Sequence, residues 1–305
     1  MPEPYAIGID LGGSSVKSVA VAAEGRHLSD ALSEFDPDAQ MQWAADIRKI
    51  VATTEKERGC AATWIGLSAP GFAAPNRRSI ACMPGRLAGL QGLDWTEFLG
   101  RPKAVPVFND AHAALLGEAW LGAAKGLKDV FMLTLGTGVG GAAIVEGRLL
   151  TGHIGRGGHL GHICLDPSGP PDVTGMPGSL EDALGNWTIQ ARTKGQFATT
   201  HELVAAHLAG DSKATEIWLE SVQKLACGIA SLVNVLDPEA VIVGGGIARS
   251  GAALFKPLQE ALDKIEWRPT VSRVKLLPAE LGELAGAYGA AFAGINYDAK
   301  GTKIC

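Results

Sequence analysis

The sequence predicts an α/β fold built from two related halves, and three observations lead to this prediction. Residues 5–22 and 130–147 share one design, in which an apolar strand, a glycine-rich turn with hydroxyl side chains and a second apolar strand follow one another. Strands alternate with helical segments along the rest of the chain, which is typical of α/β proteins. The chain has 305 residues, more than a single core usually holds, so two domains are expected.

The composition limits the classes of function. Hydrophobic residues make up 47% of the chain and charged residues 19%, which predicts a globular protein with large buried sheets. The net charge of −5 offers no broad basic surface, so no nucleic-acid partner is expected. The five cysteines form no C-x-x-C pair and the amino terminus lacks a leader pattern, which indicates a reducing, cytoplasmic location. No apolar run approaches the roughly 20 residues that span a bilayer, so no membrane partner is expected.

Hydrophobic periodicity and turn residues place the elements of the first half. An amphipathic pattern with Trp43, Ile47 and Val51 on one face predicts a helix that packs on the first sheet. Glycines at the end of the helix expected over 111–126 mark the passage into the second half. The expected elements are the hairpin 5–22, a helix over 39–58, a strand over 61–69 that ends at Pro70-Gly71, an irregular stretch to residue 94, a strand over 104–108 and a helix over 111–126.

The second half starts with the hairpin 130–147 and continues with an unusually long loop. Residues 151–178 contain eight glycines and four prolines and show no periodicity, and a loop of this length indicates a function. Ser250 is placed to cap the helix that follows it. The other expected elements are a core helix over 218–236 that Asp237-Pro238 ends, a buried strand over 240–246 that enters a glycine turn, a helix from residue 251, a strand over 273–277 and a helix over 281–295.

The two glycine turns are candidate phosphate sites. Glycine lacks a Cβ, so backbone N–H groups approach phosphate oxygens closely, and two such hairpins would face one nucleotide. A tight turn without a ligand is the alternative. Residues 136–141 also match G-x-G-x-x-G, but a strand rather than a helix follows them, which argues against a dinucleotide site. The candidate residues are Gly12, Gly13, Ser14, Ser15, Gly136, Thr137 and Gly138.

Two charged residues accompany the first turn. Asp10 stands where the first strand meets the glycines, and a carboxylate beside phosphate-binding amides suggests a magnesium ion held through water. A solvated turn aspartate is the alternative. Lys17 lies seven residues later, across the hairpin, where it either neutralises phosphate or borders the strand.

Asp110 is the candidate catalytic residue. An aspartate before a helix is often an amino-terminal cap, which is the alternative interpretation. A phosphoryl-transfer enzyme that acts on an alcohol needs a carboxylate at a strand end, to orient the hydroxyl and accept its proton. Asn109 stands beside it and could hydrogen-bond a neighbouring hydroxyl.

The long loop carries two histidines, His159 and His162. Paired histidines suggest a metal, but only Cys164 lies nearby and the spacing of a zinc site is missing, so hydrogen bonds to a polar substrate are favoured. Glu181 is either a capping partner of Ser179 or a substrate ligand, and the sequence leaves both open.

Together these residues resemble the ROK family of sugar kinases. The resemblance covers nearly the whole chain and implies a two-domain actin-like ATPase (ribonuclease H-like) fold with a central cleft. It also implies ATP and Mg²⁺, transfer of the γ-phosphoryl group to a hexose hydroxyl, usually O6, and a homodimer. The motifs are GIDLGGSSVK, GLSAPG, FNDAHAALLGE, LTLGTGVGGAAIVEG, the His162 loop, VIVGGGI and ELAGAYGAA.

The resemblance also assigns roles and domains. Asp110 is the implied base. The implied sugar-binding residues are Gly71, Asn109, Asp110, His159, His162 and Glu181, and the implied adenosine turn is Gly244, Gly245 and Gly246. The expected small domain comprises residues 1–118 and about 281–305, and the expected large domain comprises residues 119–280.

Three departures from the family pattern affect these expectations. His159 stands where the family usually has a glutamate, so one sugar-hydroxyl acceptor is lost or altered. Gly85 follows Pro84 where the family often has an asparagine. The family often binds zinc through the histidine matching His162 and three cysteines, and this chain has other residues there, so structural zinc is not expected. Those residues are Asp172, Thr174 and Ser179.

The resulting hypothesis is an ATP-dependent hexose kinase. ROK repressors add an amino-terminal DNA-binding module, but here the first strand begins within a few residues of Met1, so no such module is expected. The alternative, motivated by the altered sugar loop, is a non-catalytic sugar or nucleotide sensor on the same fold. An oxidoreductase is a third, remote possibility. The identity of the hexose, and the use of polyphosphate in place of ATP, stay open.

Overall fold

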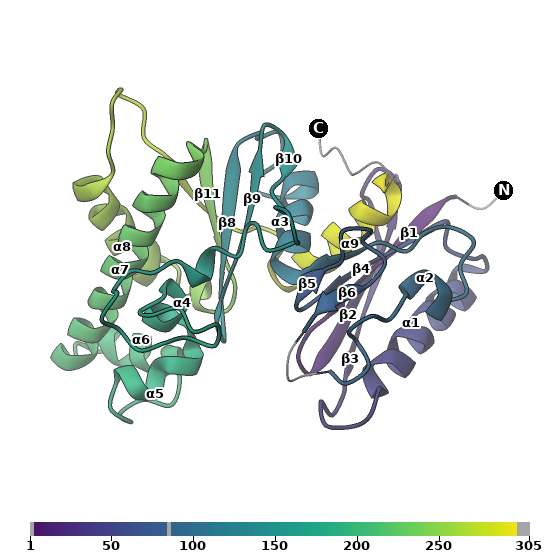
Figure 1. Cartoon of the computed structure of the whole chain (residues 1–305), viewed down its shortest axis with the longest axis horizontal. Coiled ribbons are helices and arrows are strands. Elements are labelled where there is room, and N and C mark those ends of the chain that lie inside the picture. Colours follow the sequence, from purple (N-terminus) through teal and green to yellow (C-terminus); the bar gives the residue numbers. More distant parts are fainter. Residues whose placement is uncertain (1–2, 84–86, 298–305) are drawn as a thin grey trace. The chain divides into compact units, whose positions relative to one another are not determined.

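The computed structural model describes residues 3–83 and 87–297 and divides into two compact units. The first unit comprises Met1–Gly126, Gly147–Gly158 and Glu280–Cys305, and the second comprises Leu127–Glu146 and His159–Ala279. Each unit combines a sheet with helices, which confirms the expected α/β class (Figure 1). The departure at Pro84-Gly85 lies outside the described residues.

The sheet of the first unit contains the first predicted hairpin. Its strands are ordered β3-β2-β1-β4-β7. β1 pairs antiparallel with β2 and parallel with β4, and β4 pairs parallel with β7. β3 was not expected, because its side chains are largely exposed and it has no apolar alternation. The strands are β1 (Tyr5–Leu11), β2 (Ser15–Ala22), β3 (His27–Glu34), β4 (Trp64–Ala69) and β7 (Val107–Asn109).

Alternate residues of β1 face two different helices. Tyr5, Ile7 and Ile9 belong to the core that includes the apolar face of α1 (Gln42–Arg58), as the sequence predicts. Ala6 instead packs with α9 (Ala285–Asn296), drawn in yellow in Figure 1. Small residues on this second face therefore let α9 lie close to the sheet.

The contact of α9 with its neighbours is made backbone to backbone. A Cβ on Gly8 of β1 would overlap the carbonyl oxygen of Ala287, and a Cβ on Gly66 of β4 would overlap that of Ala290. On the other side, a Cβ on Gly289 would overlap the carbonyl oxygen of Ala113 in α3 (Asp110–Leu121). Glycine is therefore the only residue that fits these positions without a shift of the backbone.

A buried carboxylate also joins α3 to the last segment of the chain. Glu118 is fully buried and accepts hydrogen bonds from the amides of Ala123, Glu280 and Leu281. These donors offset the cost of burying the charge, which is several kcal/mol for an unpaired ion. Glu118 therefore fixes the entry to α9 on α3.

The remaining elements of the first unit are short. Two strands differ from the expectation, since β4 begins at Trp64 rather than at residue 61, and β7 begins three residues later and ends one residue later than the strand expected over 104–108. The stretch expected to be irregular contains a small β-ladder. These elements are β5 (Phe72–Ala73), β6 (Ile80–Cys82), α2 (Trp95–Phe98), β10 (Arg148–Leu149) and η4 (Gly282–Leu284).

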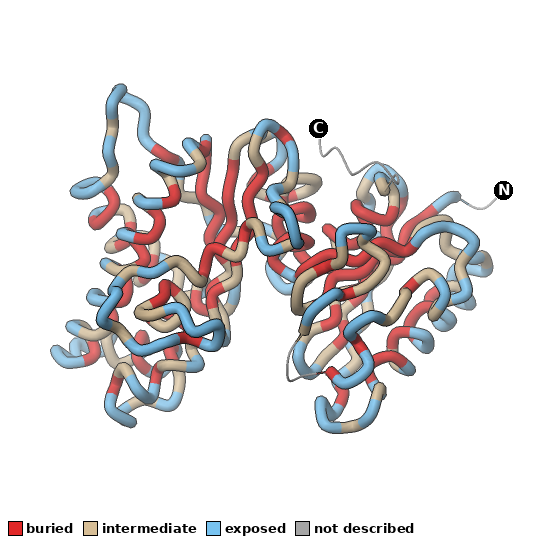
Figure 2. Tube along the Cα trace, viewed as in Figure 1, coloured by how far each residue is buried: buried red, intermediate tan, exposed pale blue. Residues whose placement is uncertain are grey.

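The second unit repeats the sheet order of the first. β8 pairs antiparallel with β9 and parallel with β11, and β11 pairs parallel with β12. In the first unit β1 pairs with β2 and β4, and β4 pairs with β7, in the same directions. The central strands of both sheets are buried over most of their length (Figure 2). This repetition agrees with the two related halves that the sequence predicts. The strands are β8 (Val130–Leu135), β9 (Val139–Val145), β11 (Ala240–Gly244) and β12 (Lys275–Pro278).

Helices build the core of the second unit around α7 (Ser212–Leu236). By length and composition α7 could cross a membrane, because an 18-residue window within it has a mean hydropathy of 1.2. Such a segment was not expected from the sequence. Its side chains Trp218, Val222 and Leu225 are buried in the core with Phe131 and Leu133 of β8. The other helices are η1 (Leu160–His162), α4 (Leu180–Leu184), η2 (Asn186–Thr188), α5 (Ile189–Arg192), α6 (Thr200–Leu208), η3 (Ile247–Ser250) and α8 (Ala252–Ile265).

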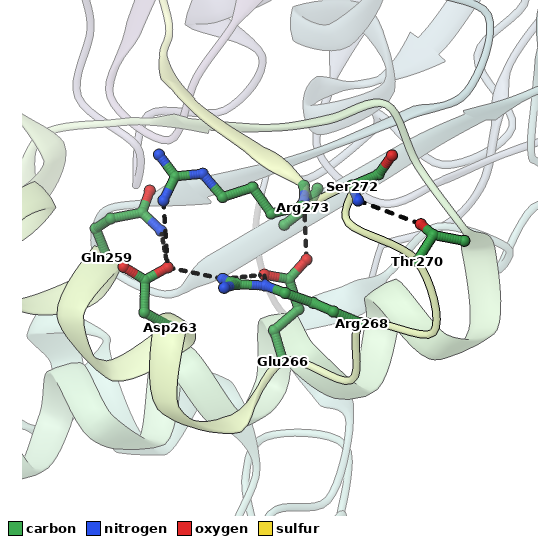
Figure 3. A network of polar contacts seen from close by, with 8 residues as sticks. Gln259, Asp263, Glu266, Arg268, Thr270, Ser272 and Arg273 are labelled. Carbon is green, nitrogen blue, oxygen red and sulfur yellow. Dashed lines mark hydrogen bonds and ion pairs between the residues drawn. The ribbon is translucent and has the colours of Figure 1, made fainter.

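The prediction that Ser250 caps α8 is wrong. Gly251 is the N-cap residue, and its φ of 56° lies in the left-handed region that glycine favours, so the turn does not present the Ser250 hydroxyl to the helix amides. At the other end of α8, Arg268 donates to Asp263 and to Glu266 (Figure 3). Glu266 in turn accepts from the amide of Val274, so this network holds the connection to β12 in place.

We expect Gly289→Ala to destabilise the protein severely, by about 3 kcal/mol or more, because its methyl group would overlap the α3 backbone. Urea unfolding at constant pH measures the change. Gly136→Ala is the matched control, because no atom lies within 4 Å of a Cβ at that position. Equal unfolding free energies for the two variants would contradict the backbone contact between α3 and α9.

Candidate functional site

In the first unit the parallel strands β1, β4 and β7 end at one edge of the sheet and bring several sequence-predicted residues together. Asp10 lies near the end of β1, opposite Ser68 of β4, and Asn109 is the last residue of β7. Asp110 follows as the first residue of α3. Carboxyl ends of parallel strands are common places for ligands in α/β sheets.

Asp10 lies in a confined environment. The Ser68 hydroxyl donates to Asp10 Oδ1 at 2.6 Å, and a Cβ on Gly286 of α9 would lie 2.7 Å from the carboxyl carbon. Burial raises the pKa of Asp10 to about 6, and the charge of Asp110 contributes in the same direction. The two carboxyl groups therefore repel each other, which favours a cation near them.

The first glycine turn is open to the solvent at its tip. The amide of Gly12 donates to the carbonyl oxygen of Ser15 at 2.8 Å, which closes the turn, and Gly13 and Ser14 are exposed. Lys17 pairs with Asp10 across the hairpin, but its Nζ lies 3.2 Å from Glu283 Oε2. The structure therefore places Lys17 beside the turn and gives it an acidic partner that the sequence did not indicate.

Asn109, rather than Asp110, caps α3. The Asn109 side chain accepts hydrogen bonds from the amides of Ala111 and His112, and its Nδ2 donates to the carbonyl oxygen of Gly71 at 3.0 Å. Gly71 has a φ of 96°, and a Cβ there would overlap the carbonyl oxygen of Cys82. Asp110 is exposed. Its carboxylate is thus accessible to a substrate, and a catalytic role requires such access.

The second glycine turn has backbone partners within the second unit. The amide of Asn186 donates to the carbonyl oxygen of Gly136, and that of Trp187 donates to Thr137. A Cβ on Gly136 would have open space around it, so a ligand can approach this turn. Behind it, a Cβ on Gly138 would overlap the carboxylate of Glu181.

Glu181 is not the capping partner of Ser179. The Ser179 side chain accepts from the amide of Asp182 and caps α4. Glu181 Oε2 instead accepts from the amide of Val139 at 3.0 Å, at the end of the second glycine turn. A carboxylate from α4 therefore fixes the shape of a turn that lies about forty residues earlier in the sequence.

The expected adenosine turn lies beside the second glycine turn. β11 runs parallel to β8, with Gly244 opposite Thr134, so Gly244 and Gly136 leave the same edge of the sheet. Gly245 has a φ of 88°, and a Cβ there would overlap the backbone of Leu135. Gly246 follows without a close neighbour. The two turns thus form one surface of the second unit.

His162 is held by a buried aspartate. Its Nδ1 lies 2.8 Å from Asp172 Oδ2, and the other Asp172 oxygen accepts from the amide and hydroxyl of Thr174 and the amide of Met176. Burial alone would raise the pKa of Asp172, but the hydrogen bonds from Thr174 and His162 bring it down to about 2. The ionised carboxylate therefore fixes the His162 ring.

His162 and Asp172 also belong to a candidate metal site. His162, Asp172 and Glu181 offer ligand atoms that lie within 4.8 Å of one another. One imidazole and two carboxylates lack the thiolates that structural zinc sites usually contain. Asp172 already accepts four hydrogen bonds, and Glu181 accepts one from Val139. These residues do not fit a structural zinc ion, and the expected absence of zinc stays a prediction.

Two functional residues were not found from the sequence. Ser68 contacts Asp10, and its signal is a single polar residue within an otherwise apolar strand. Asp172 was noted in the sequence only as the residue at one of the zinc-binding cysteine positions of the family pattern, and its hydrogen bond to His162 was not predicted. His159 is placed next to η1, two residues before Gly161. Its predicted sugar contact stays a prediction.

Comparisons with known proteins agree on one family. A model of the ROK family matches residues 6–294. The glucokinase of Thermotoga maritima is 32% identical over 95% of this chain and 97% of its own length. The crystal structure of the ROK hexokinase from Thermus thermophilus has a TM-score of 0.82 and is 33% identical, with 95% of this chain and 97% of that chain covered.

A further solved structure contains ligands. The ROK family glucokinase from Streptomyces griseus, determined in complex with glucose and AMPPNP, has a TM-score of 0.78. It is 28% identical, and the match covers 95% of this chain and 99% of that chain.

We expect Asp10→Asn to stabilise the ligand-free protein at pH 7.5, by on the order of 1–2 kcal/mol. The raised pKa of Asp10 means that its contribution to stability is complete below pH 3.8 and is lost as the pH rises through about 6. The neutral amide has no such loss, so the variant and the parent should converge near pH 4. Urea unfolding of both proteins between pH 4 and 8 measures this, and a pH-independent difference would contradict it.

We expect Asp172→Asn to lower the unfolding free energy by about 1–3 kcal/mol, because an amide cannot accept all the hydrogen bonds of the carboxylate. The imidazole NMR signals of His162 should shift in the same variant. Asp166→Asn, in the exposed part of the same loop, is the control and should change neither quantity. Stoichiometric zinc in the purified parent protein would show instead that a metal joins His162 to Asp172.

Proposed function

The chain belongs to the ROK family, and we infer that it is an ATP-dependent hexose kinase that transfers the γ-phosphoryl group to a sugar hydroxyl. The observation that carries this function is the exposed carboxylate of Asp110 at the amino end of α3, beside Asp10 and directly after the Asn109 cap. This is the arrangement that phosphoryl transfer to an alcohol requires. We propose O6 of glucose or a related hexose as the acceptor.

Asp110 acts as the general base. As the sugar oxygen forms its bond to the γ-phosphorus and the bond to the leaving ADP oxygen breaks, the hydroxyl proton passes to the Asp110 carboxylate. Asn109 keeps Asp110 in place because both its side-chain groups hold the backbone, at Ala111 and at Gly71. Positioning and electrostatics then supply most of the rate.

The phosphate-binding residues act through backbone amides and charge. The proposed phosphate ligands are amides and hydroxyls of the two glycine turns, formed by Gly12, Gly13, Ser14 and Ser15 in the first unit and by Gly136, Thr137 and Gly138 in the second. The amides of Gly12 and Gly136 instead close these turns, on the carbonyl oxygens of Ser15 and Gly138. Asp10 would hold magnesium through water, which fits its raised pKa and its repulsion with Asp110. When bound, magnesium offsets the negative charge of the phosphates. Gly244, Gly245 and Gly246 are proposed to contact adenosine.

The proposed sugar contacts begin with His162 and Glu181, because each uses one side-chain atom for a hydrogen bond within the second unit. His162 uses Nδ1 for Asp172, which leaves Nε2 for a sugar hydroxyl. Glu181 uses Oε2 for Val139, and its other oxygen is proposed to accept from the sugar. His159, Gly71 and the second Nδ2 hydrogen of Asn109 are further proposed contacts. A histidine at 159 in place of a carboxylate changes the preference among sugars.

Further proposals concern the fold, the domains, the oligomeric state and the location of the protein. The repeated sheet order supports the two-domain actin-like ATPase fold. We propose a small domain of residues 1–118 and about 281–305 and a large domain of residues 119–280, whereas the compact units place residues 119–126 and 147–158 with the first unit. We also propose a cytoplasmic homodimer without a nucleic-acid partner. The alternative, a non-catalytic sensor, differs from the kinase in one measurable property, because it binds sugar without releasing ADP.

We expect Asp110→Asn to lower the rate of sugar-dependent ADP release by about 10²–10⁴-fold, because the amide cannot accept the hydroxyl proton. The assay uses a panel of aldohexoses, ketohexoses and amino sugars. Asp38→Asn, at an exposed aspartate of the same unit, is the control and should keep the parent rate. A rate near that of the parent for Asp110→Asn would exclude Asp110 as the base, and sugar binding without ADP release in the parent would favour the sensor.

A further inference from the structure

The first unit contains a pocket that the proposed reaction does not use. It lies between β5 with the turn that follows it and the loop of residues 151–155, and its volume is about 170 Å³. Arg77, His112 and His153 line it, and none of its lining residues is acidic. This combination of basic side chains in a concave space favours an anionic ligand.

Arg77 is the central cation of this pocket. Its guanidinium lies over the ring of Phe108, 4.2 Å from the ring centre, and burial lowers its pKa. Among residues 3–83 and 87–297, no carboxylate forms an ion pair with it. A partly buried guanidinium without a counter-charge is costly, and an anion in the pocket would offset that cost.

The backbone at Arg77 is strained, and the side chain of this residue lines the pocket. Arg77 has a φ of 55°, a left-handed conformation that costs a residue with a side chain about 1–2 kcal/mol. Its amide donates to the carbonyl oxygen of Ala74 at 2.8 Å and its carbonyl oxygen accepts from Val107 at 2.8 Å. The hydroxyl of Tyr297 donates to the carbonyl oxygen of Asn76 and holds the same turn. Glycine would relieve this strain, but it would also remove the guanidinium that packs on Phe108 and lines the pocket.

The opposite wall is also fixed. His112 is buried, and its Nε2 donates to the carbonyl oxygen of Gly157 at 2.8 Å, which ties the loop to α3. The amide of Gly157 donates to the carbonyl oxygen of Thr151 within the loop. A Cβ on Gly155 would lie 2.7 Å from the carbonyl oxygen of Ala73. The loop therefore stays close to β5, with His153 exposed at the rim. The pocket is thus formed before any ligand binds, which lowers the cost of binding.

We propose that this pocket binds a small oxyanion, a phosphate or carboxylate group, through Arg77 and His153. Its volume is below the roughly 300–1,000 Å³ of pockets that hold drug-sized ligands, so it suits a small anion or one charged substituent of a larger molecule. The planar guanidinium matches either group with two parallel hydrogen bonds. This site is independent of the sugar kinase function, because it needs neither ATP nor Asp110.

The test is calorimetric titration of the full chain, without ATP, with inorganic phosphate, glucose 6-phosphate and glucuronate. The variant is Arg77→Gln, which removes the charge and keeps a polar side chain that is shorter than arginine. We expect its affinity for the best of these probes to fall at least tenfold. Arg148→Gln is the matched control, because Arg148 is an exposed arginine of the same unit that does not line the pocket, and it should bind like the parent.

The glycine turns can also bind phosphate, and the comparison of variants separates the two sites. Binding at the turns is the same in Arg77→Gln and in the parent, so a probe that binds both equally is assigned to the turns and counts against the proposal. His153→Gln, at an exposed position where folding is not affected, should weaken binding at least threefold and provides the test if Arg77→Gln does not fold.

The three probes identify the source of the anion. Dependence on Arg77 for phosphate and glucose 6-phosphate indicates a phosphate group, and dependence for glucuronate alone indicates a sugar acid. The proposal is overturned if none of the three binds in a manner that Arg77 or His153 affects. Asp110→Asn should keep the anion affinity of the parent, so failure of this proposal and failure of the kinase assignment are distinguishable.

Discussion

The structure of the first unit depends on the close approach of α9 to β1, β4 and α3. Gly8 and Gly66 on the strands, and Gly289 facing Ala113 of α3, remove the side chains that would otherwise separate these backbones. The same approach brings Gly286 against the carboxyl group of Asp10, which limits its hydration and raises its pKa. α3, which begins with Asp110, rests on the other side of α9. Packing of the last helix therefore sets the environment of both carboxylates on which the proposed chemistry relies.

Asp10 and Asp172 show how donors decide the behaviour of a confined carboxylate. Burial acts in the same direction on both. Asp10 accepts a hydrogen bond from the Ser68 hydroxyl, and burial and the charge of Asp110 disfavour its ionised form. Asp172 accepts from Thr174, Met176 and His162, so its charged form is retained. The environment of Asp10 therefore suits a residue whose ionised form a bound cation would stabilise. That of Asp172 suits a residue that holds other groups in place.

Local features of the sequence were sufficient to predict the two hairpins, the α/β class and the position of Asp110 at the start of a helix, because apolar runs and glycine turns depend on neighbours in the chain. Features that depend on distant residues were missed. β3 is largely exposed and lacks the alternation, and Ser250 lost its capping role to the positive φ of Gly251. The contacts of Glu181 with Val139 and of Asn109 with Gly71 join segments about forty residues apart, which no local pattern reveals.

The two halves share a sheet order but have diverged in what their turns carry. The first turn stands between Asp10 and Lys17, which are paired across β1 and β2, whereas the corresponding strands of the second unit pair Thr134 with Gly140. Charged residues therefore flank the first turn and uncharged residues flank the second, which has Glu181 behind it as a support. A repeated fold with one charged and one uncharged turn suits a ligand whose charge is concentrated at one end, as it is in a nucleoside triphosphate. Under the proposed function, differences at a few positions of two sheets with the same strand order would separate cation binding from nucleotide binding.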